Sequence, residues 1–175
     1  MRTIEPIAKF DFAFSQFCLR HRFSLPFARV SQAISHTGDG HLYAVIGLLA
    51  WLIDDTLGLM FLLTGLLSFA LELPLYWASK NLFKRRRPQE LSELLPSFIT
   101  PSDRYSLPSG HTAAAFLMAN LLGHFYPDTQ ILALSWASLI ATARILLGVH
   151  FFTDVLIGAL LGMSCATSAI AIMGA

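Results

Sequence analysis

The sequence LGLMFLLTGLLSFALELPLYWASKN, residues 57–81, is long and apolar enough to cross a lipid bilayer as a helix. The whole chain has the same character, since 55% of its 175 residues are hydrophobic, 13% are charged and the mean hydropathy is +0.60. These values exclude an ordinary soluble protein and predict a membrane protein with one domain, residues 1–175. Lys and Arg number 12 against 11 Asp and Glu, so the charge gives no reason to expect nucleic acid as a partner.

Four further apolar stretches have the character of membrane spans: residues 41–53, 110–126, 129–149 and 154–173. The sequence therefore predicts an all-α fold, a transmembrane helical bundle with five spans. Residues 4–19 have helical apolar spacing and predict an amphipathic helix in the membrane interface, followed by a second amphipathic piece at 25–35, within an N-terminal segment 1–37. The alternative is a sixth span, but Glu5, Lys9 and Asp11 interrupt every window that could cross.

Two acids in apolar surroundings need an explanation. Glu72 lies inside the span 57–81, two helical turns before Lys80, so the two could share a face and be joined through a water or another side chain. An acid in a span is functional by default, although a polar contact between helices explains Glu72 equally well. Asp39, in the turn Gly38-Asp39-Gly40, is most simply a turn residue or a helix cap.

Polar residues gather at one membrane face when the spans are followed in order. The residues at this face are Lys80, Arg87, Ser109, Gly110, His111, Arg144, His150 and Asp154. The stretch Leu107–Thr112 (LPSGHT) predicts a helix start, capped by Ser109, whose free backbone N–H groups face an anion. With three cations beside it, this helix start predicts a pocket for a phosphate-like oxyanion. The polar connection 84–107 predicts a short interfacial helix that roofs the pocket.

Two histidines supply the pocket with chemistry. His150 and Asp154 are four residues apart, close enough for the carboxylate to fix the tautomer of the ring and raise its nucleophilicity. One of the two histidines, His111 and His150, could then attack phosphorus while the other protonates the leaving oxygen. These cations also have an interpretation without a functional site, because Lys and Arg after a span often serve only to orient the protein in the membrane. A metal site is the weaker interpretation, since the surrounding cations would repel a divalent ion. The histidines interpreted as structural are His21, His36, His41 and His124.

Three motifs resemble those of the type 2 phosphatidic acid phosphatase family, which shares its active site with vanadium haloperoxidases. The first motif is Lys80 with Arg87-Pro88, the second is Pro108-Ser109-Gly110-His111, and the third is Ala143-Arg144 with His150 and Asp154. Together they cover residues 80–154.

The resemblance implies a role for each matched residue. His150 would be the nucleophile that forms a phosphohistidine, Asp154 would orient it, and His111 would be the general acid. The residues that would bind phosphate are Lys80, Arg87, Ser109, Gly110 and Arg144, with no metal and no cofactor. The family pattern has serine where this chain has Ala143, so one hydrogen bond to phosphate is missing or replaced. Bacterial relatives commonly have six spans.

The resemblance and the charges give different expectations for the sidedness of a multi-pass protein in the cell (inner) membrane. All twelve Lys and Arg residues fall on the active-site side of a five-span topology, whereas Asp54, Asp55 and Asp128 fall on the other, which favours a cytoplasmic pocket. Many bacterial relatives that resemble this chain instead have an active site that faces the periplasm.

The predicted function is hydrolysis of a lipid phosphomonoester or diphosphate, with polyprenyl diphosphate, phosphatidic acid and phosphatidylglycerol phosphate as substrate possibilities. Three other functions stay open. One is transfer of the phosphate to another acceptor through the same histidine. Another is haloperoxidase activity, which the apolar composition disfavours. The third is anion binding by a membrane protein without catalysis, which would fit Ala143 and Glu72. The sequence says nothing about oligomeric state.

Overall fold

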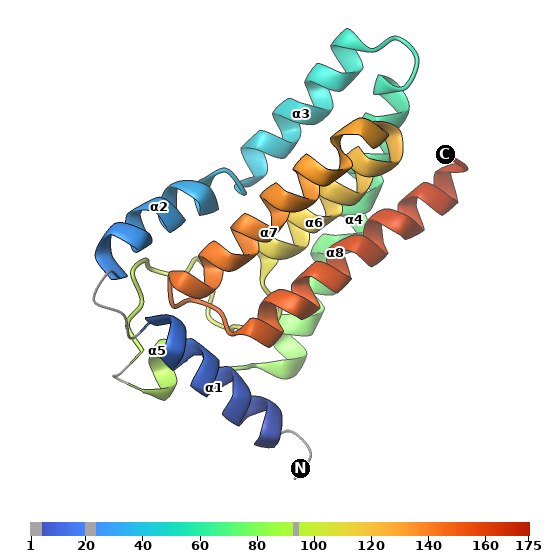
Figure 1. The fold of residues 1–175 in the computed structure, drawn as a ribbon. Coiled ribbons are helices and arrows are strands. Elements are labelled where there is room, and N and C mark those ends of the chain that lie inside the picture. The colour runs from blue at the N-terminus through green and yellow to red at the C-terminus, as the bar shows by residue number, and fades with distance from the viewer. Residues whose placement is uncertain (1–4, 20–23, 93–94) are drawn as a thin grey trace.

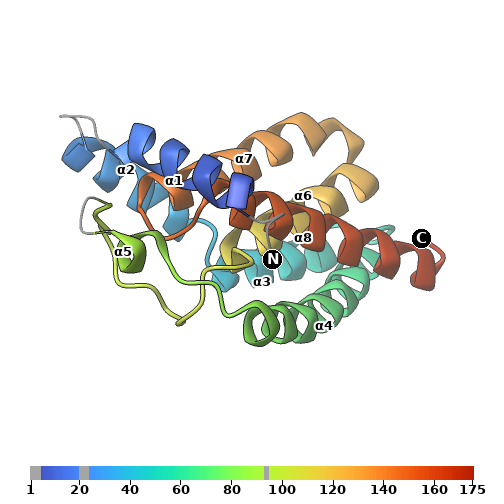
Figure 2. The same cartoon turned by 90° about the horizontal axis from the view of Figure 1, so that it is seen from below.

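Every regular element in the described part of the chain is a helix, as the sequence predicts. The computed structural model describes residues 5–19, 24–92 and 95–175. The elements are α1 (Glu5–Leu19), α2 (Ser24–His36), α3 (Gly40–Ile53), α4 (Gly58–Phe83), α5 (Pro88–Leu91), α6 (Gly110–Phe125), the 3-10 helix η1 (Pro127–Thr129), α7 (Gln130–Leu146) and α8 (Phe152–Met173). The helices α3, α4, α6, α7 and α8 run lengthwise beside one another, while α1, α2 and α5 gather at one end (Figures 1 and 2).

The long helices carry the composition of a membrane protein. Within the described ranges, three helical stretches are long and apolar enough to cross a bilayer: Gly58–Leu91, Pro127–Leu146 and Phe152–Met173. The apolar helices α3 and α6 are shorter, with 14 and 16 residues. Large apolar side chains such as Leu52, Ile53 and Leu132 are exposed, as expected where helices face lipid. The chain is therefore a membrane protein, and the number of five spans stays a prediction.

Helix α6 lies at the centre of the bundle and packs against α8 most closely. A Cβ on Gly158 would lie 2.5 Å from the carbonyl oxygen of Ser109, and one on Gly162 would lie 2.0 Å from that of Ala113. These two glycines, four residues apart, let the backbones of α6 and α8 approach one another as in other membrane helix pairs. The contact fixes the start of α6 against the first turn of α8.

One helix end and one connecting segment differ from the sequence predictions, and both lie at the site. The predicted helix 129–149 ends at Leu146, because Gly148 adopts a positive φ of 72° and its missing side chain leaves room for the Pro96 carbonyl oxygen, 2.0 Å from where a Cβ would lie. The turn that follows releases His150 from the helix. The roof predicted for residues 84–107 contains the four-residue helix α5, and the rest of its described part is irregular.

The N-terminal helices cover the site end of the bundle. Helix α1 packs on the start of α8 through Phe10, Phe14 and Phe152, whose ring centroids lie 5.3–6.0 Å apart. Helix α2 packs along α7. The predicted amphipathic helices at 4–19 and 25–35 are confirmed over the described residues; Ile4 lies outside them.

Candidate active site

The eight predicted site residues gather at the end of the bundle where α1, α2 and α5 lie. Four of them, Gly110, His111, Arg144 and His150, line a cavity of about 630 Å³. The other four, Lys80, Arg87, Ser109 and Asp154, do not line this cavity and are buried beside it; Lys80 and Arg87 bond Asp103, which lines it. The sequence motifs therefore converge in space, in two layers.

His150 is held in one tautomer by a backbone carbonyl. Its Nδ1 donates to the carbonyl oxygen of Ser106 at 2.8 Å, so the proton lies on Nδ1 and Nε2 keeps its lone pair. Burial lowers the pKa of His150 to about 4, although the neighbouring Asp154 carboxylate opposes this shift. The ring is therefore neutral at physiological pH, as a nitrogen nucleophile must be.

Asp154 lies beside His150 without being its nearest partner. Its Oδ2 is 3.8 Å from His150 Nδ1 and accepts hydrogen bonds from the Phe151 backbone N–H, at 2.8 Å, and from the Ser106 hydroxyl. Asp154 thus holds Ser106, and Ser106 in turn holds His150. The predicted pair of carboxylate and ring is present at this distance, and Ser106 also joins the two, since its carbonyl accepts from the ring and its hydroxyl donates to the carboxylate.

Arg85 is a site residue that the motifs did not indicate. Its guanidinium donates to Asp154 Oδ1 at 2.7 Å and to Asp11 Oδ2 at 2.6 Å, and it lies 4.5 Å from the ring centroid of Phe151. Asp11 and Asp154 are both fully buried. In the sequence, Asp11 is an acid within an apolar helical pattern, and Arg85-Arg86-Arg87 is a run of three cations. An acid in such a helix together with a run of cations is the signal that could have indicated this ion pair.

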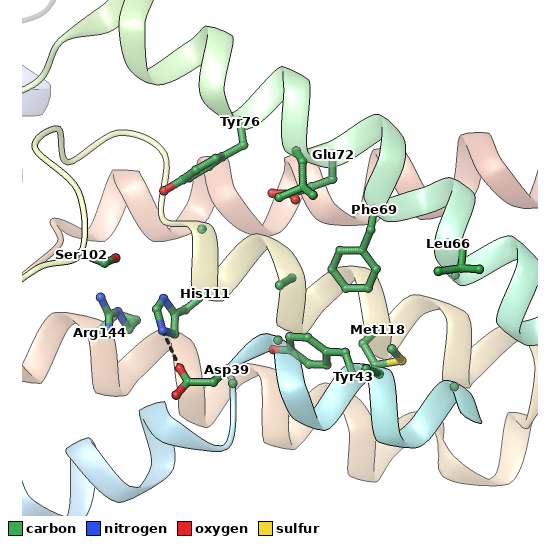
Figure 3. Close-up of a pocket in the computed structure, with 18 of the residues that line it drawn as sticks. Asp39, Tyr43, Leu66, Phe69, Glu72, Tyr76, Ser102, His111, Met118 and Arg144 are labelled. Atoms are coloured by element: carbon green, nitrogen blue, oxygen red, sulfur yellow. Dashed lines mark hydrogen bonds and ion pairs between the residues drawn. The ribbon is translucent and has the colours of Figure 1, made fainter. Parts of the chain in front are cut away.

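His111 is paired with a carboxylate from another helix. Its Nε2 lies 3.0 Å from Asp39 Oδ1, and the other oxygen of Asp39 lies 2.6 Å from His36 Nδ1 (Figure 3). Asp39 stands at the N-cap position of α3 but makes no side-chain cap bond. Asp39 is therefore the turn residue that the sequence predicted, although its side chain bonds two histidines and does not cap the helix. His36, interpreted as structural, reaches the site through Asp39. His41 and His124 have no site contact among the described residues, and His21 lies outside them.

The predicted phosphate-binding cations meet an anion that the chain itself supplies. Asp103 Oδ1 accepts from Lys80 Nζ at 2.7 Å and also from the Arg87 guanidinium. Burial alone would raise the pKa of Asp103, but hydrogen bonds from Lys80 and Tyr76 outweigh it and hold the pKa below its ordinary value. Lys80 is therefore joined to Asp103, and among the described residues no direct bond links Lys80 to Glu72.

Arg144 keeps donors available to a ligand. It is 4% exposed, and its guanidinium donates to Ser35 Oγ at 2.9 Å, while its Nε has no hydrogen-bond partner. A buried donor without a partner beside a cavity is typical of an anion-binding site. Ala143, where the family pattern has serine, is buried in α7.

The start of α6 differs from the expected capped helix. The hydroxyl of Ser109 makes no cap bond and pairs with Thr112 Oγ1 at 2.9 Å, while its backbone N–H donates to the Asp154 carbonyl at 3.0 Å. The N–H of Ser109, the residue before the first turn of α6, is therefore bonded within the chain. Gly110 makes room for Tyr76, whose ring lies 2.9 Å from where a Cβ would be.

The cavity extends from these polar residues into the apolar part of the bundle, between α3, α4 and α6. Its deep walls include Gly47, Phe61, Leu66, Phe69 and Met118 (Figure 3). A second cavity of about 710 Å³ adjoins the polar end, shares His111 and Arg144 with the first, and is lined by residues of α2 and the loop near Thr100. The site thus connects a polar vestibule with an apolar pocket.

Solved structures of two membrane proteins have a similar fold. The structure is similar to LpxE of Aquifex aeolicus, with a TM-score of 0.77, 25% sequence identity, and coverage of 91% of this chain and 93% of that one. It is also similar to a transmembrane PAP2-type phosphatidylglycerolphosphate phosphatase from Bacillus subtilis, with a TM-score of 0.76, 26% identity, and coverage of 95% and 86%.

The family model for the PAP2 superfamily matches residues 56–175, from just before α4 to the last residue, and so includes all eight predicted site residues. Helices α1 to α3, which supply Asp11 and Asp39, precede the matched region. Since the match covers well over half of the chain and both structural neighbours have the same helical arrangement, this protein belongs to the PAP2 superfamily.

Proposed function

We propose that this protein is a membrane phosphatase that hydrolyses a lipid phosphate without a metal, through a phosphohistidine. The observation that carries the proposal is the state of His150: a buried, neutral imidazole whose Nδ1–H is bound by Ser106 and whose ring faces the same cavity as His111 and Arg144. In the first step Nε2 of His150 bonds to phosphorus while the bond from phosphorus to the lipid oxygen breaks, and His111 gives that oxygen a proton.

In the second step water attacks the phosphohistidine. His111 accepts a proton from this water as its oxygen bonds to phosphorus, and the bond from phosphorus to His150 Nε2 breaks. Arg144 would contact the transferring phosphoryl group, and Lys80 and Arg87, which bind Asp103 behind the cavity wall, would add positive charge near it. Phosphoryl transfer depends mainly on such positioning and charge stabilisation.

The shape of the cavity favours a lipid as the substrate. The headgroup phosphate would lie at the polar end, and a hydrocarbon chain would occupy the apolar pocket between α3, α4 and α6. The description of the Bacillus subtilis neighbour as a phosphatidylglycerolphosphate phosphatase supports the same substrate class. Phosphatidic acid, phosphatidylglycerol phosphate and polyprenyl diphosphate all have this form.

The test is phosphate release by detergent-purified protein from these three lipids in EDTA, with His150→Ala and His124→Ala side by side. His124 is an exposed histidine that does not line the cavity, so it is a matched control. We expect release that EDTA spares, that His150→Ala lowers by about 10³-fold or more, and that His124→Ala leaves unchanged. Full activity of the His150→Ala protein would refute the mechanism.

A further inference from the structure

Two polar side chains lie in the apolar part of the cavity, away from the cations. Glu72 reaches it from α4 and Tyr43 from α3, and both line it although they are only 3% and 4% exposed. Figure 3 shows them on opposite walls, with the carboxyl group and the hydroxyl both directed toward the His111 end of the pocket.

Neither group has a protein partner in the described chain. The Tyr43 hydroxyl is buried and makes no hydrogen bond, and no described residue bonds to the Glu72 carboxylate; Lys80, two turns along the same helix, is bonded to Asp103 instead. Buried polar groups in native proteins nearly always have a partner. The cavity that both groups line is therefore where their partner belongs.

Their position relative to the phosphate site fits one part of a lipid. Glu72 precedes Tyr76 by four residues, which is about 6 Å along a helix axis, and the Tyr76 ring packs against Gly110, next to His111. The Tyr43 ring is fixed opposite by Phe69 and Trp136, whose ring centroids lie 5.7 and 5.8 Å away. The two groups thus flank the path of a lipid immediately below its phosphate, where the headgroup joins the chains.

We propose that Glu72 and Tyr43 form a subsite for the ester, amide or hydroxyl groups that link fatty acyl chains to a lipid headgroup. A phenol donates a hydrogen bond to an acyl carbonyl, and a carboxylate accepts one from an amide N–H or a hydroxyl. A polyprenyl phosphate has only hydrocarbon at this place and would leave both groups unpaired. The inference rests on the proposed function and narrows its substrate class to acylated lipid phosphates.

The experiment compares lipids that differ in these linkages, in detergent micelles with EDTA. The substrates are a diacylglycerol phosphate, its dialkyl ether analogue without carbonyls, a ceramide phosphate with an amide and a hydroxyl, and farnesyl phosphate. The variants are Tyr43→Phe and Glu72→Leu. The control is Ser68→Ala, a buried polar residue on α4 that bonds the Thr64 carbonyl and does not line the cavity.

We expect the wild-type protein to favour the acylated lipids over the ether and farnesyl substrates by about 10-fold or more in kcat/KM. Tyr43→Phe should abolish the preference for the ester over the ether, and Glu72→Leu the advantage of the ceramide phosphate. Both variants should retain hydrolysis of farnesyl phosphate, and Ser68→Ala should retain the wild-type preferences. Equal use of all four lipids, or an equal loss on all four in both variants, overturns the subsite.

A binding measurement separates failure of the subsite from failure of the proposed function. Native mass spectrometry of the His150→Ala protein with the ester and ether lipids reports binding without turnover. If no lipid is hydrolysed, the proposed function fails, and a binding preference that Tyr43→Phe abolishes still supports the subsite. Equal binding of both lipids in that case rejects the subsite too.

Discussion

Asp39 is the residue that holds the ring of the proposed general acid, His111, from outside the region matched by the family model. A carboxylate that accepts a hydrogen bond from one imidazole nitrogen orients the ring and stabilises the imidazolium, in which the other nitrogen also carries a proton. We therefore expect Asp39→Asn to lower kcat for alkyl lipid phosphates by about 10-fold to 100-fold. Because a p-nitrophenolate leaving group needs little protonation, turnover of p-nitrophenyl phosphate should fall much less.

His36→Gln is the control for Asp39, because His36 bonds the same carboxylate but its side chain is 83% exposed. Exposed pairs of this kind contribute little, so both substrates should be turned over at nearly the wild-type rate. An equal loss on both substrates in Asp39→Asn would show that Asp39 only supports the structure.

The buried imidazole of His150 sets a second expectation at the level of one residue. Its pKa of about 4 lies below the ordinary value of 6.5, so the unfolded chain binds more protons than the folded protein between these pH values. Stability should therefore fall as pH decreases from 6.5 toward 4, and His150→Asn should remove this part of the dependence. Melting temperatures of both proteins in detergent across this range give the test; parallel curves would contradict it. Protonation of His150 should also make kcat/KM fall on the acid side of its pH profile, with a midpoint near pH 4.

Between elements, Arg85 connects α1 with α8 by binding Asp11 and Asp154. Arg85→Ala leaves two fully buried carboxylates without their cation, and breaking a buried ion pair in this way costs about 3–5 kcal/mol. We expect a lower melting temperature and a large loss of activity, with part of the stability recovered in the double variant Arg85→Ala/Asp11→Asn. Arg86→Ala, at the exposed neighbouring position, is the control and should melt like the wild type. Independent, additive effects of Arg85→Ala and Asp11→Asn would show that the pair is not coupled.

In the molecule as a whole, the close packing of α8 on α6 brings the site residues at the start of α6, such as His111, next to those at the start of α8, such as Asp154. A methyl group on Gly158 or Gly162 would collide with the backbone of α6, which typically costs about 1–3 kcal/mol. Gly162→Ala should lower the melting temperature. Gly158→Ala should lower kcat as well. A methyl group there would push on the Ser109 carbonyl, and the Ser109 N–H donates to the carbonyl oxygen of Asp154 in the site. Gly40→Ala is the control, since a Cβ there meets nothing within 4 Å; equal melting of all three variants would contradict the argument.

The sequence by itself determined the helical class, the approximate helix boundaries and the residues that gather at the site. Each of these depends on local information: apolar runs, helical periodicity and the spacing within three motifs. Where the sequence misjudged a boundary, as at Leu146, the cause was tertiary, because the chain turns at Gly148 to pass the Pro96 carbonyl.

Only the tertiary structure decided which partner each site residue has. Asp39 and His111 are 72 residues apart, Asp11 and Arg85 are 74 apart, and Ser106 and His150 are 44 apart. No local pattern encodes such pairs, because a buried charge takes whichever partner the packing of the helices brings within hydrogen-bond distance. The motifs therefore identified the chemical groups, and the packing of the helices and of the loop before α6, together with α1, α2 and α3, determined their protonation, orientation and charge balance.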